Sequence, residues 1–263
     1  MIGIFDSGIG GLTVVKEVFK QLPQYQIIYF GDTARTPYGN KSKELITHYA
    51  FEDTDFLLGK GANLIIVACN TVSAVASDEL KNKYKDIPIF EVITPAVDKA
   101  IKVTQNKRIG VIGTRATINS RIYEDKIKAT KNGFRMTGKA CPLFVPLVEE
   151  GWAERPETKM IAKKYLHRLK MEQIDTLILG CTHYPLLKDL IRIKMGKKVN
   201  LVDPAEETIL NVKQFLEKNP NLEKSLAKNN NHEFYFSDIS LNLKQIADKW
   251  LGQNIEPKLV NLE

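Results

Sequence analysis

Short apolar runs recur along the chain, and longer stretches that mix apolar and polar positions separate them. The runs are rich in Ile, Val and Phe and are bounded by polar residues, a pattern that predicts buried β-strands. They read MIGIF (1–5), QIIYFG (26–31), LIIVAC (64–69) and IPIFEVI (87–93).

The stretches between these runs have helical periodicity. GLTVVKEVFKQL (11–22) places Leu12, Val15, Val18, Phe19 and Leu22 on one face of a helix. SKELITHYAFEDTDFLLGKG (42–61) repeats the pattern over a longer span. Because strands alternate with helices, the sequence predicts an α/β fold built on parallel sheets.

The pattern restarts in the middle of the chain. RIGVIGTRAT (108–117) resembles MIGIFDSGIG (1–10), with Ile109 over Ile2 at an offset of 107 residues. Cys181 in LILGCTHYP (177–185) lies over Cys69 in LIIVACNT (64–71) at an offset of 112 residues. Two landmarks in the same order and at nearly the same spacing predict two related α/β halves.

The second half is predicted to end near VNLVDPAEET (199–208), a strand followed by a proline turn and a helix start. The tail then holds an amphipathic helix, a polar loop KNNNH (228–232), a strand EFYF (233–236) and a final helix LNLKQIADKWLG (241–252). It is too short for a domain of its own, so we expect it to return to the first half. The predicted domains are therefore residues 1–92 with 209–263, and residues 93–208.

Cys69 and Cys181 each follow a predicted strand, with hydroxyl or amide side chains directly behind them. In open parallel sheets, ligands gather at the carboxyl ends of the strands. If the two halves face each other, the thiols lie on opposite walls of one cleft. One thiolate can then remove a proton from one face of a carbon atom while the opposite thiol returns a proton to the other face. This arrangement predicts inversion of a stereocentre.

Neighbouring residues can fix the protonation state of each thiol. Asp6 ends the first predicted strand, and His183 lies two residues after Cys181. A cysteine in a strand is more often a small buried apolar residue, the interpretation that we give to Cys141 in ACPLFVP. A redox disulfide between Cys69 and Cys181 is a further alternative.

The segment DSGIGG (6–11) lies between a predicted strand and a predicted helix. It lacks the lysine and the spacing of a P-loop and is not a dinucleotide fingerprint. Its glycines let backbone N–H groups approach a phosphate or a carboxylate at a helix start. The loop GDTARTPYGN (31–40), which carries Tyr38 and Gly39, is either part of the site or a plain proline turn. Short neutral donors are added by Ser7, Asn70, Thr71, Thr182, Thr114 and Thr117.

The composition excludes several other classes of protein. Of 263 residues, 43% are hydrophobic and 26% are charged, which is ordinary for a soluble globular protein. No apolar run approaches the roughly 20 residues of a membrane span, and no signal peptide is apparent, so we expect a cytoplasmic protein. Three cysteines, without a C-x-x-C pair or a Cys/His cluster, indicate neither a disulfide scaffold nor a metal site.

The net charge of +7 comes mainly from scattered lysines. A nucleic-acid binder usually concentrates arginines and aromatic residues in a stripe. We interpret these lysines as a solvated surface that mildly attracts small anions, and we expect no nucleic-acid partner.

Several segments together strongly resemble the glutamate racemases, cofactor-independent enzymes that make D-glutamate for peptidoglycan. The paired ACNT and GCTHYP segments are the most specific, and the resemblance runs from end to end of the chain. The matching segments are FDSGIGGLTV (5–14), GDTARTPYG (31–39), ACNTVSA (68–74), GTRATINSRIY (113–123), PLFVPLVEEG (142–151), LGCTHYPLL (179–187) and LVDPAEET (201–208).

The resemblance implies a two-domain α/β fold of pseudo-twofold symmetry with the active site between the domains. Cys69 and Cys181 match the two catalytic acid/base cysteines, and Glu149 is an auxiliary candidate. It also implies that glutamate is the substrate, that no cofactor is used and that the enzyme is a homodimer. The positions that match substrate contacts are Asp6, Ser7, Tyr38, Gly39, Asn70, Thr71, Thr182 and His183.

The residues alone reach only two-thiol inversion of a small anion. Aspartate and hydantoin racemases share that logic, and the resemblance is what favours glutamate. A non-catalytic α/β ligand-binding protein would keep the cleft without needing the thiols. A cysteine hydrolase is a third alternative, although no Cys-His-Asp or Cys-His-Asn triad stands out in the sequence.

Overall fold

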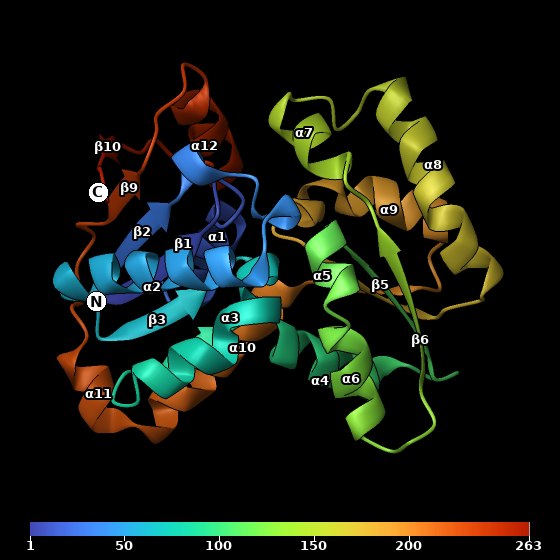
Figure 1. The fold of residues 1–263 in the computed structure, drawn as a ribbon, viewed down its shortest axis with the longest axis horizontal. Coiled ribbons are helices and arrows are strands. Elements are labelled where there is room, and N and C mark those ends of the chain that lie inside the picture. The colour runs from blue at the N-terminus through green and yellow to red at the C-terminus, as the bar shows by residue number, and fades with distance from the viewer. Residues whose placement is uncertain (263) are drawn as a thin grey trace.

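Two parallel β-sheets, each covered by helices, lie side by side in the computed structural model, which describes residues 1–262 (Figure 1). The predicted fold class, two similar parallel-sheet α/β units, is confirmed. Both chain termini lie at the unit that contains the first sheet.

The first sheet, sheet A, has six parallel strands in the order β10-β9-β2-β1-β3-β4. Its central strands are buried throughout, because helices cover both faces. The strands are β1 (Ile2–Asp6), β2 (Ile27–Gly31), β3 (Leu64–Val67), β4 (Ile89–Glu91), β9 (Glu233–Phe236) and β10 (Pro257–Leu259).

The second sheet, sheet B, repeats this arrangement with four parallel strands in the order β6-β5-β7-β8. Each strand takes the place of the sheet A strand numbered four lower, so β5 corresponds to β1 and β7 to β3. The strands are β5 (Arg108–Gly113), β6 (Arg135–Ala140), β7 (Thr176–Gly180) and β8 (Asn200–Val202). The internal repeat predicted from the sequence is therefore visible in the strand order.

The two halves share a glycine near the start of their first strand, Gly3 in β1 and Gly110 in β5, for a packing reason. Gly3 pairs with Ile65 of the neighbouring strand, and Gly110 pairs with Leu177 at the equivalent place in sheet B. A Cβ at Gly3 would lie 2.8 Å from Ala62 Cβ, and one at Gly110 would lie 2.3 Å from Ile174 Cδ1. In both units, neighbouring side chains pack directly onto the strand backbone at this point.

Some of the helices begin at a side-chain cap or at a proline. Ser42 accepts a hydrogen bond from the backbone of Leu45, and Asp203 accepts one from Ala205 directly after the predicted strand end. Pro204 occupies the first helical position of α10, as its missing N–H favours. The α-helices are α1 (Leu12–Gln21), α2 (Lys43–Gly59), α3 (Asn70–Lys83), α4 (Ile93–Val103), α5 (Arg115–Asn119), α6 (Ile122–Ala129), α7 (Phe144–Glu149), α8 (Pro156–Met171), α9 (Lys188–Met195), α10 (Pro204–Lys218), α11 (Pro220–Ser225) and α12 (Leu243–Leu251).

The tail extends sheet A, because β9 pairs with β2 and β10 pairs with β9. The domain limits of residues 1–92 with 209–263, and of residues 93–208, remain predictions. The first division falls between β4 and α4, and the second falls inside α10, which is continuous. This helix packs against both α1 and α4.

Two strands were not predicted. β6 reads RMTGKA, is only partly buried and lies at the edge of sheet B, so it lacks the apolar run that marks a central strand. β10 has three residues, begins with a proline and lies at the edge of sheet A. Within residues 1–262, no helix is both long enough and apolar enough to cross a membrane.

Candidate active site

Cys69 and Cys181 occupy equivalent places in the two sheets. Cys69 lies two residues after β3 and directly precedes α3, and Cys181 follows β7 without a gap. Their exposed fractions are 5% and 6%, and both sulfurs are free thiols. The strand ends thus place one thiol in each unit, as the sequence predicted.

The surroundings of Cys69 come from its own unit. Its Sγ donates a hydrogen bond to Ser7 Oγ at 3.3 Å. Burial, with the nearby carboxylate of Asp6, raises the pKa of the Cys69 thiol to about 12. Burial also raises the pKa of Asp6, although His183 and the backbone N–H groups of the glycine-rich loop act against it. Cys69 is therefore a thiol at neutral pH and suits the role of proton donor.

Cys181 has a different neighbourhood. Its Sγ lies 3.9 Å from Nδ1 of His183, whose Nε2 lies 2.8 Å from Oε1 of Glu149. Burial lowers the pKa of His183, but the hydrogen bonds to Cys181 and Glu149 outweigh it and raise that pKa to about 10. The imidazole is therefore positively charged at neutral pH, and Trp250 packs edge-on against it with ring centroids 5.6 Å apart. A cation beside the sulfur stabilises the thiolate that a proton acceptor needs.

This chain of three side chains was not found from the sequence, which offered no obvious triad. Glu149 ends α7, far from Cys181 along the chain, and the sequence pointed to it only through the resemblance. The arrangement resembles the Cys-His-carboxylate order of cysteine hydrolases.

The two units touch at the glycine-rich loop. A Cβ at Gly10 would lie 2.2 Å from Thr182 Oγ1 and 2.6 Å from His183 Nδ1, so only glycine fits there. Thr13 Oγ1 lies 3.0 Å from the backbone oxygen of Thr182, to which it donates, and Thr182 Oγ1 donates to Asp6 Oδ1 at 3.5 Å. The loop after β1 is therefore in direct contact with the turn that holds Cys181.

A small cavity of about 10 Å³ lies at this contact, roughly enough for one water molecule. Asn70, Cys181 and Thr182 are among the residues that line it. The cavity therefore brings residues from the Cys69 side and the Cys181 side to one place.

The other predicted contact residues divide into two groups. Thr71 Oγ1 lies 3.1 Å from Thr114 Oγ1 across the two units, and a Cβ at Gly39 would lie 3.2 Å from Thr114 Cβ. Tyr38 is different, because its hydroxyl donates to Asp32 and lies 3.4 Å from Asp53 Oδ2. In residues 1–262 the side chain of Tyr38 makes no hydrogen bond to another predicted site residue. Gly39 and Thr71 thus face the second unit, whereas the Tyr38 side chain anchors its loop to the first.

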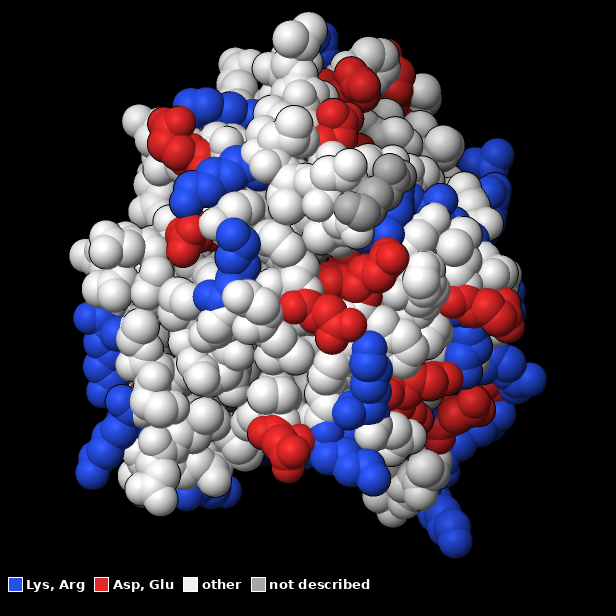
Figure 2. Space-filling view, turned by 60° about the vertical axis from the view of Figure 1, so that its left-hand side comes forward, with Lys and Arg blue, Asp and Glu red and all other residues white. Residues whose placement is uncertain are grey.

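The structure also bears on the expectations for Cys141, for the charged surface and for metal binding. Cys141 is fully buried in the core, as predicted for a structural cysteine. Figure 2 shows Lys and Arg interleaved with Asp and Glu over one face, which fits a solvated charged surface. Among residues 1–262, no group of three or more His, Cys, Asp and Glu side chains is arranged to hold a metal ion.

The family model for Asp/Glu/hydantoin racemase matches residues 11–211. A glutamate racemase of Geobacter metallireducens is 46% identical over 251 residues, covering 95% of this chain and 92% of that protein. One from Aquifex aeolicus is 45% identical and covers 99% of this chain and 97% of that protein. Both relatives match over essentially the whole chain.

Solved structures agree with this result. The glutamate racemase of Francisella tularensis, solved in complex with D-glutamate, superposes with a TM-score of 0.91 at 38% identity and covers 100% of this chain and 97% of its own. The isoform RacE1 of Bacillus anthracis gives a TM-score of 0.90 at 38% identity, with coverage of 100% and 97%. The resemblance noted in the sequence is therefore confirmed, and the chain is a racemase that belongs to the Asp/Glu/hydantoin racemase family.

Proposed function

We propose that this protein interconverts L- and D-glutamate by two-base proton transfer at the α-carbon, with Cys69 and Cys181 as the two bases. The observation that carries the proposal is the pair of free, buried thiols at equivalent strand ends of two touching units. The relatives named glutamate racemase, one of them solved with D-glutamate, support glutamate as the substrate.

The substrate carboxylates are held by neutral donors in this mechanism. Backbone N–H groups of residues 6–11 and the side chains of Ser7, Asn70, Thr71 and Thr182 lie around the contact between the units. Hydrogen bonds to the carboxylate next to the α-carbon stabilise the negative charge that develops when the proton leaves.

Proton transfer then uses the difference between the two thiols. The Cys181 thiolate, beside the imidazolium of His183, takes the α-proton of L-glutamate, and the Cys69 thiol gives its proton to the opposite face of the carbanion. One C–H bond breaks and one forms, so the product is D-glutamate and the proton has moved from one wall to the other. For D-glutamate the roles of the two sulfurs exchange.

The proposal includes a physiological setting. D-glutamate would supply peptidoglycan synthesis in the cytoplasm, and we expect the working enzyme to be a homodimer without a cofactor. These expectations rest on the resemblance to the glutamate racemases.

The test is racemisation of L-glutamate by the wild type, followed by optical rotation, together with the variants Cys69→Ser and Cys181→Ser. Serine is far less acidic than cysteine, so both variants should lose racemisation in both directions. Cys141→Ala is the matched control, because it removes a buried thiol that the mechanism does not use, and it should stay active.

Partial reactions separate two bases from one. With a glutamate analogue that can eliminate a β leaving group, only the first proton abstraction is needed. Cys69→Ser should retain elimination from the L analogue, and Cys181→Ser should retain it from the D analogue. If one variant lost elimination from both isomers and the other from neither, a single base would be at work and the two-thiol mechanism would be wrong.

A further inference from the structure

Tyr123 connects the two units at a place that the proposed mechanism does not use. It lies on α6 in the second unit, and its side chain is 2% exposed. Its hydroxyl nevertheless bonds to a residue of the first unit, donating to Asn70 Oδ1 at 2.7 Å. Asn70 directly follows Cys69 and begins α3. The segment GTRATINSRIY (113–123) thus ends on a residue that reaches the Cys69 side of the site.

The ring of Tyr123 is fixed on the Cys181 side. A Cβ at Gly180, the residue before Cys181, would lie 3.3 Å from Tyr123 Cε2, so the ring rests on the end of β7. One side chain therefore packs against the strand that ends at Cys181 and holds the amide that follows Cys69.

The hydrogen bond determines which way the amide of Asn70 points. Burial, with the charges of Glu91 and Cys181, raises the pKa of Tyr123 well above its ordinary value, so its hydroxyl remains a donor. Since Asn70 Oδ1 accepts that bond, the NH₂ group is the end of the amide left for other partners. Asn70 also lines the small cavity with Cys181 and Thr182. An amide NH₂ group is a donor that can bind a carboxylate oxygen.

We propose that Tyr123 is a positioning residue: through its hydrogen bond to Asn70 it orients the Asn70 amide as a donor to a substrate carboxylate. This inference rests on the proposed function, because it assigns the anion that Asn70 binds. It predicts that loss of the hydroxyl weakens binding of the substrate more than it slows the chemical step.

The test is Tyr123→Phe, which keeps the ring on Gly180 and removes only the hydroxyl. We expect KM for both glutamate isomers to rise about 3- to 30-fold, the effect of losing one hydrogen bond of a buried group, while kcat stays within about 3-fold. In the Asn70→Ala background the same change should alter KM by less than about 2-fold, because the amide that it orients is gone.

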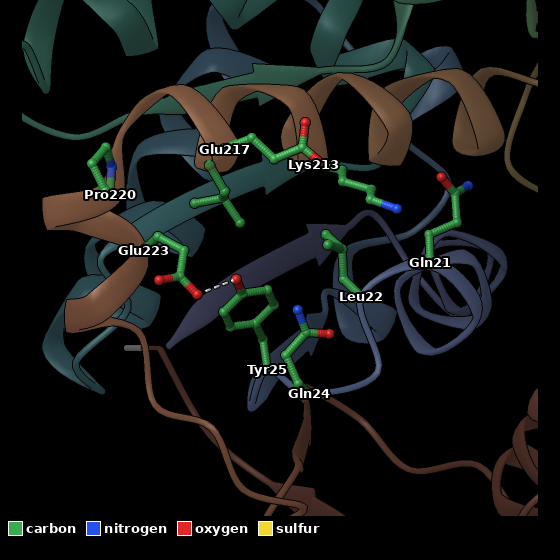
Figure 3. A pocket seen from close by; sticks show the side chains of 9 residues that line it. Gln21, Leu22, Gln24, Tyr25, Lys213, Glu217, Pro220 and Glu223 are labelled. Carbon is green, nitrogen blue, oxygen red and sulfur yellow. Dashed lines mark hydrogen bonds between the residues drawn. The ribbon is translucent and has the colours of Figure 1, made fainter.

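Tyr25→Phe is the matched control. Tyr25 is 3% exposed and donates to Glu223 Oε1 at 2.7 Å, the same length as the Tyr123 bond. Figure 3 shows it between residues 21–25 and the helices α10 and α11. The groove there has a volume of about 450 Å³, and its lining includes none of the predicted site residues. Tyr25→Phe should leave KM and kcat unchanged, even if its midpoint of thermal unfolding falls as much as that of Tyr123→Phe.

The outcomes separate this inference from the function on which it rests. If the wild type does not racemise glutamate, both are overturned. If the wild type is active but Tyr123→Phe leaves KM unchanged, or acts equally with and without Asn70, only the positioning role is overturned. Should Tyr123→Phe not fold, Asn70→Asp decides, because it replaces the donor with an anionic oxygen: a raised KM supports the inference, and an unchanged KM overturns it.

Discussion

Replacing Gly10 with alanine tests whether the two units must touch for the reaction to proceed. Gly10 lies between β1 and α1, and its carbonyl accepts hydrogen bonds from the backbone and the side chain of Thr13 at 3.1 and 2.9 Å. An added Cβ would lie 2.2 Å from Thr182 Oγ1 and 2.5 Å from Cε1 of His183. The methyl group would therefore press on two residues of the turn that holds Cys181.

The size of the effect follows from these distances. A Cβ atom essentially never lies within 3.0 Å of a non-bonded heavy atom, so the groups at this contact must move apart by 0.5 to 0.8 Å, the differences between 3.0 Å and the distances of 2.5 and 2.2 Å. The hydroxyl of Thr182 could rotate away, but the contact with the ring of His183 would remain. Displacing a reacting group by about 1 Å costs roughly 100-fold in rate, and overpacking costs about 1–3 kcal/mol of stability.

The assay is kcat for glutamate racemisation in both directions at saturating substrate, with thermal unfolding measured in parallel. Gly10→Ala should lose about 100-fold in kcat in each direction. Gly59→Ala is the control, because the added Cβ at the end of α2 would meet no atom within 4 Å beyond its chain neighbours and its own helix backbone, and it should keep full activity. A folded Gly10→Ala variant with the kcat of the wild type would show that the close contact between the units plays no part in the reaction.

Three further predictions concern pH, substrate binding and cofactors. The free energy of unfolding should fall as the pH rises from about 6.5 to about 10. Folding raises the pKa of His183 from its ordinary 6.5 to about 10, so protonated His183 stabilises the folded state fully below pH 6.5, and this stabilisation is lost by about pH 10. Urea unfolding should show this slope in the wild type, and an equal slope in His183→Asn would contradict the assignment. Thr71→Ala should lower kcat/KM about 5- to 150-fold, since it removes one donor to a charged group, and a change within error would remove Thr71 from the site. Activity should survive exhaustive dialysis against a chelator, and a loss restored by zinc or pyridoxal phosphate would refute cofactor independence.

The sequence predicted the central strands and the two thiols because both depend on local patterns. β1, β3, β5 and β7 are built mainly of apolar residues, with a charged or polar residue only at an end, so their burial can be read directly from their residues. Cys69 and Cys181 follow such strands, and strand ends of parallel sheets are where ligands bind. The edge strand β6 escaped prediction because an exposed edge needs no apolar run.

Contacts between distant segments could not be predicted in this way. The bond from Tyr123 to Asn70 joins residues that are 53 positions apart, and that from Thr13 to Thr182 spans 169 positions. Nothing in the local pattern of a tyrosine or a threonine tells which remote group its hydroxyl will meet. Likewise, Tyr38 lies in a segment that matches a family motif, but only the fold shows that its hydroxyl donates a hydrogen bond to Asp32.

A comparison of the two repeats shows how the thiols come to have neighbours of opposite charge at equivalent places in the fold. At the offset of 107 residues, Asp6 at the end of β1 corresponds to Gly113 at the end of β5, so the strand-end carboxylate exists only in the unit of Cys69. His183 supplies the opposite charge beside Cys181. The two thiols therefore lie at equivalent strand ends but in different electrostatic surroundings, with a carboxylate near Cys69 and an imidazole beside Cys181.

This asymmetry has a thermodynamic limit in the proposed reaction. L- and D-glutamate have equal free energies in solution, so the equilibrium constant is one and kcat/KM must be equal in the two directions. The different surroundings of Cys69 and Cys181 cannot favour one isomer at equilibrium. They can only change how each direction divides kcat/KM between kcat and KM.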